Sequence, residues 1–216
     1  MYGYAANSPV RYTDPDGKTF LPILSYQYQN SKENANLFVG GFPSGNFDSE
    51  GEYKMNTIGS FGCLFVCAIN VGNSYNKTFH PESYEEQKVK TLASNSSYFH
   101  FWCECNWISD YCGMDFASGS NELKKLLADM TGENLSVEKF DGDALTSMAY
   151  QIRQFKKGAY IIAKVGGHFI NITNIDKTGQ IFYFDPYIRN TPKTYVFDDI
   201  EAFYLITTTE ENHELN

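Results

Sequence analysis

Cys63 follows a glycine and opens an apolar run, an arrangement that suits a nucleophilic thiol. The run from Cys63 to Ile69 contains neither a charged residue nor a helix breaker, and its length fits either a strand or a buried helix. We favour a helix, because a cysteine in the first helical turn has its thiolate stabilised by the macrodipole and by free backbone N–H groups. The same N–H groups would stabilise the oxyanion formed when a thiolate attacks a carbonyl, and Gly62 would let a substrate approach the backbone.

A thiolate nucleophile needs a base, and the base needs a third group to orient it. The chain has four histidines, of which His168 follows two glycines at the start of a predicted strand. Asp185 ends the return strand of the same predicted hairpin. A simple two-residue turn would put Asp185 opposite Ile172, several residues from His168. A twist or a bulge must therefore close the gap if the two side chains are to meet.

Each of these residues also has an ordinary structural interpretation. Cys63 fits a small buried hydrophobe of a core helix, which is the usual fate of a free cysteine. His168 shares a strand face with Ile170 and Ile172, where a histidine is often a core residue with its hydrogen bonds satisfied. Asp185-Pro186 fits a turn that ends a strand.

Two amphipathic helices are predicted between the cysteine and the histidine. The first begins at Asn121 and ends at Gly132, and its apolar positions fall at i, i+3, i+4 and i+7: Leu123, Leu126, Leu127 and Met130. Asp143 is the predicted N-cap of the second helix, which ends at Gly158.

The pattern changes to that of β-strands after Gly158. Strands are predicted over residues 159–165, 168–175, 181–184, 195–197 and 203–207. Helices first and a mainly antiparallel sheet last predict an α+β domain, preceded by a loop-rich segment at residues 21–60.

The first seventeen residues consist of turns and tyrosines and cannot form a core alone. The pattern Y-x-Y-x-x-N-x-P-V-x-x-x-D-P-D-G at residues 2–17 resembles the closing motif of the core in Rhs/YD-repeat proteins. The resemblance implies that residues 1–20 end such a core. Residues 21–216 would then be a variable C-terminal domain, often a toxin or effector, in a bacterial chain that is exported, secreted or attached to the cell surface. An ordinary turn-rich N-terminal arm is the alternative.

A second resemblance joins the cysteine, the histidine and the aspartate. The segments T-I-G-S-F-G-C-L-F-V-C-A at 57–68 and G-G-H-F-I-N-I-T-N-I-D…F-D-P at 166–186 are similar to those of papain-like cysteine peptidases, in particular the bacteriocin-processing (double-glycine leader) branch. The resemblance implies a papain-like fold in which a helix carrying the cysteine packs on an antiparallel sheet. It also implies that Cys63 is the nucleophile, His168 the general base and then acid, and Asp185 the orienting carboxylate.

That family uses a glutamine upstream of the cysteine as an oxyanion donor. The stretch Leu21–Asn30 resembles this region, so the resemblance assigns the role to Gln29, with Gln27 close to it and Asn56 as a substitute nearer to the cysteine. The family commonly has small polar residues just after the cysteine, whereas this chain has Leu-Phe-Val at 64–66.

A rival candidate site lies at His100, Cys103, Cys105 and Cys112, which carry zinc-ligand side chains. Their spacing, H-x2-C-x-C-x6-C, differs from paired C-x2-C knuckles, and the tyrosines, phenylalanines and tryptophans around them favour a packed insertion. A Cys103–Cys105 redox pair remains an alternative. The chain has five cysteines, an odd number, so they cannot all pair within one molecule.

The whole-chain composition excludes several classes of protein. The 216 residues suit one domain of ordinary size, or one domain with a small appendage. A balance of 17 Lys+Arg against 26 Asp+Glu disfavours nucleic acid as a partner, because phosphate contacts need basic side chains. The 17 phenylalanines and 16 tyrosines exclude intrinsic disorder. No apolar run approaches the roughly 20 residues of a membrane-spanning helix, and the start Met1-Tyr2-Gly3-Tyr4 predicts no signal peptide in this segment.

Taken together, these features predict a cysteine hydrolase, in the first place a peptidase, that acts as the effector or self-processing domain of a Rhs/YD-repeat protein. The same triad would serve a deamidase or an acyltransferase. A catalytically inactive binding module with the same fold is the alternative from another class, since aromatic residues are favoured at interfaces. The predicted partners are a peptide or protein substrate and, for an effector, an immunity protein; no membrane and no cofactor is predicted.

Overall fold

The computed structural model describes residues 21–43, 45–47, 50, 52–106, 109–116, 120–144, 158–175, 180–188 and 194–208. The Rhs/YD-repeat motif of residues 1–20 lies outside this part of the chain. Most of the helix predicted from Asp143 to Gly158 also lies outside it.

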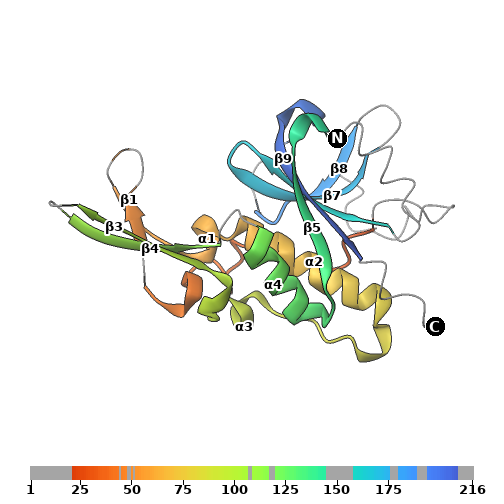
Figure 1. Ribbon diagram of the computed structural model, residues 1–216, viewed down its shortest axis with the longest axis horizontal. Helices are drawn as coiled ribbons and strands as arrows, with labels where there is room; N and C mark the ends of the chain where they lie inside the picture. The colour runs from red at the N-terminus through yellow and green to blue at the C-terminus, as the bar shows by residue number, and fades with distance from the viewer. Residues whose placement is uncertain are drawn as a thin grey trace.

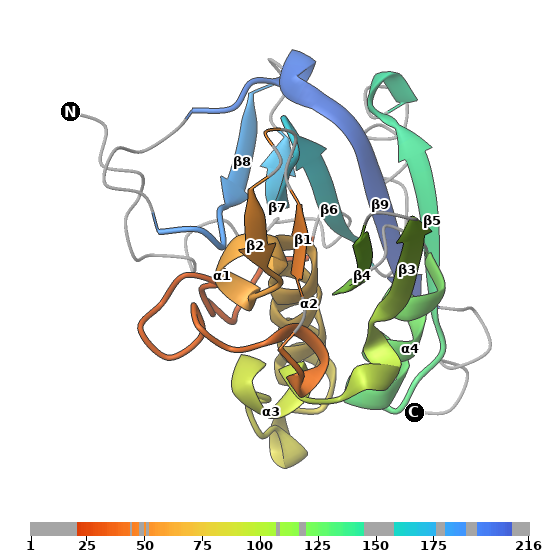
Figure 2. The same cartoon turned by 90° about the vertical axis from the view of Figure 1, so that its left-hand side faces the viewer.

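A five-stranded sheet occupies the centre of the fold. Its strands are β5 (Leu135–Asp141), β6 (Tyr160–Val165), β7 (His168–Ile175), β8 (Ile181–Phe184) and β9 (Ile200–Thr208). They follow in the order β5-β9-β6-β7-β8, as Figure 2 shows from right to left, and each neighbouring pair is antiparallel. The α+β class with an antiparallel sheet is therefore confirmed.

Helices cover one face of this sheet. The long helix α2 (Cys63–Phe79) and helix α4 (Ser120–Thr131) lie against it, and the short helices α1 (Ile58–Phe61) and α3 (Val89–Ala93) flank α2 (Figure 1). Period-2 alternation divides each central strand between two apolar clusters. Tyr160 and Ile162 of β6 pack with the helices, whereas Ile161 and Ala163 belong to a second buried cluster that includes Phe203 of β9.

Two hairpins project from one side of the body in Figure 1. One consists of β1 (Gly45–Phe47) and β2 (Tyr53–Met55), and the other of β3 (His100–Asn106) and β4 (Ser109–Asp115). Single 3-10 turns complete the described elements, at Val39–Gly41, Pro81–Ser83, Ser96–Tyr98, Gly142–Ala144 and Phe197–Asp199.

The local predictions for the helices agree with the structure. The apolar run that begins at Cys63 is a helix, and it continues past Ile69 as far as Phe79. The helix predicted from Asn121 is α4, and its four apolar positions are buried. Gly132 ends it with a positive φ of 73°, and its N–H donates to the carbonyl of Ala128.

The prediction of a strand at residues 195–197 is wrong. Tyr-Val-Phe has high strand propensity, but the Asp199 carboxylate accepts a hydrogen bond from the backbone N–H of Val196 at 2.8 Å, and the chain turns there as the 3-10 helix Phe197–Asp199. The strand predicted at 203–207 is part of β9, which already begins at Ile200. Strand β5 was not predicted, although Leu135 and Val137 alternate with polar residues in the manner of a strand.

Candidate active site

Cys63 is the first residue of helix α2 and is partly exposed. The preceding helix α1 closes at Gly62, whose N–H donates to the Ile58 carbonyl at 2.8 Å. The Gly62 carbonyl in turn accepts the N–H of Val66 at 2.8 Å, which begins the hydrogen-bond ladder of α2. The N–H groups of the first turn have no partner within the helix, so the nucleophile candidate sits in the positive end of a seventeen-residue helix.

Gly62 is required by the tight junction between α1 and α2. A Cβ on this residue would lie 2.5 Å from the Ile58 carbonyl oxygen and 2.7 Å from Ile58 Cγ2. A glycine therefore precedes Cys63 because the chain packs against itself here, whereas the sequence had suggested space for a substrate.

Gly62→Ala is expected to lower the free energy of unfolding by about 2 kcal/mol, because a backbone atom blocks the added methyl group. Urea denaturation measures this. Gly132→Ala is the matched control, since no atom lies within 4 Å of its Cβ position and only the positive φ opposes the change, at about 1 kcal/mol. A smaller loss for Gly62→Ala than for Gly132→Ala would contradict the account.

The strands bring His168 and Asp185 together. Gly166 and Gly167 have φ values of 54° and 76°, so they form the tight turn from which β7 starts at His168. His168 Nε2 lies 2.6 Å from Asp185 Oδ1. An irregularity between Ile172 and Asn174 shifts the register of this hairpin by one residue and so brings Asp185 nearer to His168, as the sequence required of a bulge or a twist.

The electrostatics of His168 favour its charged form. Burial lowers the pKa of His168, but hydrogen bonds and charge interactions with Asp185 and Cys63 outweigh burial and raise it to about 9. Because Nε2 bonds to Asp185, the second ring nitrogen, Nδ1, is left for a hydrogen bond with another group. The pKa of the imidazole thus responds to both the carboxylate and the thiol.

The loop after β8 holds the carboxylate in place. Asp185 Oδ1 also accepts the N–H of Tyr187 at 2.8 Å, and the Tyr187 ring stands edge-on to His168, with ring centroids 6.2 Å apart. The Asn30 side chain pairs with both backbone groups of Ile188, each at 2.7 Å. This N-terminal segment therefore fixes the segment that carries Asp185, 155 positions later (185 − 30).

Gln29 lies next to the segment that carries Asp185, and its side-chain amide already donates one hydrogen bond. The N–H of Gln29 donates to the Pro186 carbonyl at 2.9 Å, and its Nε2 donates to the Gly59 carbonyl of α1 at 3.0 Å. The residue is 2% exposed, and its Oε1 has no hydrogen-bond partner. Nε2 carries a second hydrogen, so an oxyanion contact is chemically open to it.

The other two candidate oxyanion donors, Gln27 and Asn56, also have partners of their own. Gln27 lies beside the middle of α2, where its backbone N–H donates to Asn70 Oδ1 at 2.9 Å. Its side chain bonds to the backbone of Gln87 and Val89. Asn56 is buried, and its backbone carbonyl accepts the N–H of Val39 at 3.0 Å.

Two residues near the site were not assigned a role from the sequence. Cys67, one helical turn after Cys63, is fully buried; burial raises the pKa of its thiol, and negative charge on Cys63 and Asp185 raises it further. Asn171 of β7 is also fully buried and donates from Nδ2 to the Cys67 carbonyl at 3.1 Å. The signal for Asn171 was a polar residue between two isoleucines, Ile170 and Ile172.

The zinc candidate lies mostly outside the described part of the chain, because the side chains of Cys103, Cys105 and Cys112 are not described. Among the described residues, no three His, Cys, Asp or Glu side chains group as metal ligands.

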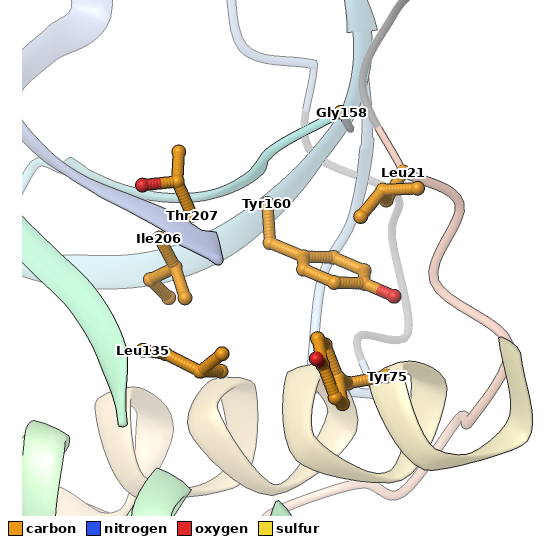
Figure 3. Close-up of a pocket in the computed structure, with 7 residues that line it drawn as sticks. All are labelled: Leu21, Tyr75, Leu135, Gly158, Tyr160, Ile206 and Thr207. Atoms are coloured by element: carbon orange, nitrogen blue, oxygen red, sulfur yellow. The ribbon is translucent and has the colours of Figure 1, made fainter. Parts of the chain in front are cut away.

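An apolar pocket lies between Leu21, Tyr75 and Tyr160 (Figure 3), and it is too tight for a water molecule. Tyr75 stands twelve residues after Cys63 on α2, about 18 Å away along the helix.

Comparison with known proteins adds no relative: no protein-family model, no curated protein and no solved structure matches the chain. None of the helices in the described residues has the length and apolarity to cross a membrane.

Proposed function

We propose that the chain is a cysteine hydrolase with a papain-like fold, in which Cys63 is the nucleophile, His168 the base and Asp185 the orienting carboxylate. The observation that carries the proposal is the position of His168, whose Nε2 lies 2.6 Å from Asp185 Oδ1. Burial lowers the pKa of His168, but its interactions with Asp185 and Cys63 raise that pKa to about 9. A histidine buried only for packing would not need to interact with both a carboxylate and a thiol.

The partial exposure of Cys63 favours an enzyme over an inactive binding module. Phe65, two residues later, is fully buried and packs against Phe99 and Phe116, whereas Cys63 is partly exposed. The bulky residues after the cysteine therefore fill the core, and Cys63 itself stays at the surface of the core.

The proposed reaction is the hydrolysis of an amide. The Cys63 thiolate attacks the carbonyl carbon, and the backbone N–H groups at the start of α2 stabilise the oxyanion. The His168 imidazolium gives its proton to the departing amine as the C–N bond breaks, which leaves a thioester. Water then attacks the thioester while His168 takes a proton from it, and the C–S bond breaks to release the acid and restore the ion pair.

The substrate would be a peptide or protein, and the domain would serve as the effector or self-processing part of a Rhs/YD-repeat chain. This context is supported by the motif at residues 2–17. Deamidation and acyl transfer would use the same residues with a different amide or a different acceptor.

Iodoacetamide at pH 7 is expected to alkylate Cys63 stoichiometrically and about tenfold faster than it alkylates free glutathione, because cysteines near a protonated histidine and at a helix N-terminus are typically the reactive ones. Peptide mapping by mass spectrometry separates Cys63 from the other four cysteines, and Cys63→Ser is the control. Cys67, which is fully buried, should remain unmodified in the folded protein. The assignment of Cys63 as nucleophile is wrong if Cys63 reacts no faster than glutathione or than Cys67.

A further inference from the structure

Asn171 presents an unusual combination of complete burial and incomplete hydrogen bonding. It lies in the middle of β7, between Ile162 of β6 and Phe184 of β8, and is 0% exposed. Its Nδ2 donates to the Cys67 carbonyl of α2, whereas its Oδ1 has no hydrogen-bond partner. A buried acceptor without a partner opposes folding, so the amide is a poor choice for stability at this position.

The backbone carbonyl of Cys67 has a second hydrogen-bond donor and does not depend on Asn171. Cys67 lies inside helix α2, where each backbone carbonyl already accepts one bond from the N–H four residues later. An apolar side chain of similar volume at position 171 would therefore leave no carbonyl of α2 without a hydrogen bond. Stability alone gives no reason for an asparagine here.

The place of the Asn171–Cys67 hydrogen bond in the fold suggests a reason for the asparagine. Cys67 is four residues from Cys63 on a helix, about 6 Å along its axis. Asn171 is three residues from His168 on a strand, about 10 Å along it. The bond thus joins the element that carries the nucleophile to the element that carries the base, close to both.

We propose that Asn171 is a positioning residue, which fixes helix α2 along β7 so that Cys63 and His168 keep their positions relative to each other. Apolar packing between a helix and a sheet is not directional and permits small sliding movements, whereas a hydrogen bond is directional and short. Acid–base pairs lose efficiency steeply when they are displaced by fractions of an ångström. The inference rests on the proposed function, because it presumes that the Cys63–His168 contact matters.

The test is Asn171→Leu, with the rate of Cys63 alkylation by iodoacetamide measured from pH 5 to pH 10 and the stability measured by urea denaturation. The expected result is a threefold to tenfold lower rate at pH 6 and a profile moved toward that of His168→Ala, with a denaturation midpoint equal to or above that of the wild type. A purely structural asparagine would change the midpoint and leave the pH profile as it was.

Asn73→Leu is the matched control. Asn73 is also fully buried, but both of its amide atoms are bonded, to Ser25 and to the backbone of Gln87, and it lies ten residues from Cys63. It should lower the midpoint and preserve the profile. A wild-type profile for Asn171→Leu, or a failure of that variant to fold, overturns the inference. If His168→Ala also retains the wild-type profile, the proposed function itself has failed.

Discussion

His168→Ala is expected to slow the alkylation of Cys63 at pH 6 by about tenfold or more. A thiol without a cationic neighbour is almost wholly protonated at that pH and reacts slowly. Although burial lowers the pKa of His168, its interactions with Asp185 and Cys63 raise it to about 9, so the imidazole stays protonated across neutral pH. The difference between wild type and variant should shrink as the pH rises through about 9, where His168 loses its proton. Rate constants measured by mass spectrometry from pH 5 to pH 10 check both points.

Two further variants sharpen this result. Asp185→Asn keeps an oxygen that accepts the Nε2 hydrogen bond but removes the charge, so we expect a smaller loss, about threefold at pH 6. His80→Ala is the control histidine, because His80 bonds to Glu133 beyond the far end of α2. The role of His168 as base is refuted if its removal leaves the rate unchanged, or if His80→Ala lowers the rate as much.

The free energy of unfolding is expected to contain a part that His168 supplies and that alkali removes. The pKa of His168 is about 9 in the folded protein against an ordinary 6.5, so the folded state binds this proton more tightly than the unfolded chain does. The stabilisation is therefore complete below about pH 6.5 and is lost as the pH rises through about 9. Since one pKa unit corresponds to about 1.4 kcal/mol, a shift from 6.5 to about 9 sets the upper limit of the loss at about 3.5 kcal/mol. Urea denaturation at pH 6 and pH 9.5 measures it.

The His168 contribution is isolated by comparing wild type with His168→Ala at both pH values. Removing the imidazole costs the same packing energy at both pH values. The contribution of the bound proton is therefore the change, between the two pH values, in the difference in unfolding free energy between wild type and variant. The same comparison of His168 with His168→Ala can be repeated in a protein that also carries Cys63→Ser. The pH-dependent stabilisation that then remains comes from Asp185, because the sulfur of Cys63 is absent. A difference between wild type and His168→Ala that does not vary with pH would show that the folded protein does not hold this proton more tightly.

Helices and turns were predictable because their signals are local. The apolar run after Gly62 and the leucine spacing after Asn121 each describe contacts within a few residues, and both segments are helices. The turn at Gly166-Gly167 needs positive φ at both residues, which glycine supplies without strain. The same local logic failed at residues 195–197, where strand propensity yielded to the hydrogen bond from Val196 to Asp199.

The candidate site could be predicted only as a set of residue types in order. Without the irregularity, the pairing of Ile175 with Ile181 would continue so that Asp185 lay level with Asn171. The observed pairing of Phe184 with Asn171 brings Asp185 level with Ile170 instead, one residue nearer to His168 and on the strand face that His168 shares. Register shifts of this kind depend on packing across the sheet and leave no mark in the spacing of two residues.

The sequence by itself determined that a cysteine begins a buried helix, that a histidine begins a strand and that an aspartate ends another. Tertiary structure alone decided that these three groups meet. The bonds that hold them together join positions far apart in the chain, as Asn171 to Cys67 and Asn30 to Ile188 do. Such bonds depend on how the elements pack together, because the local propensities that shape each element carry no information about which distant partner it will contact.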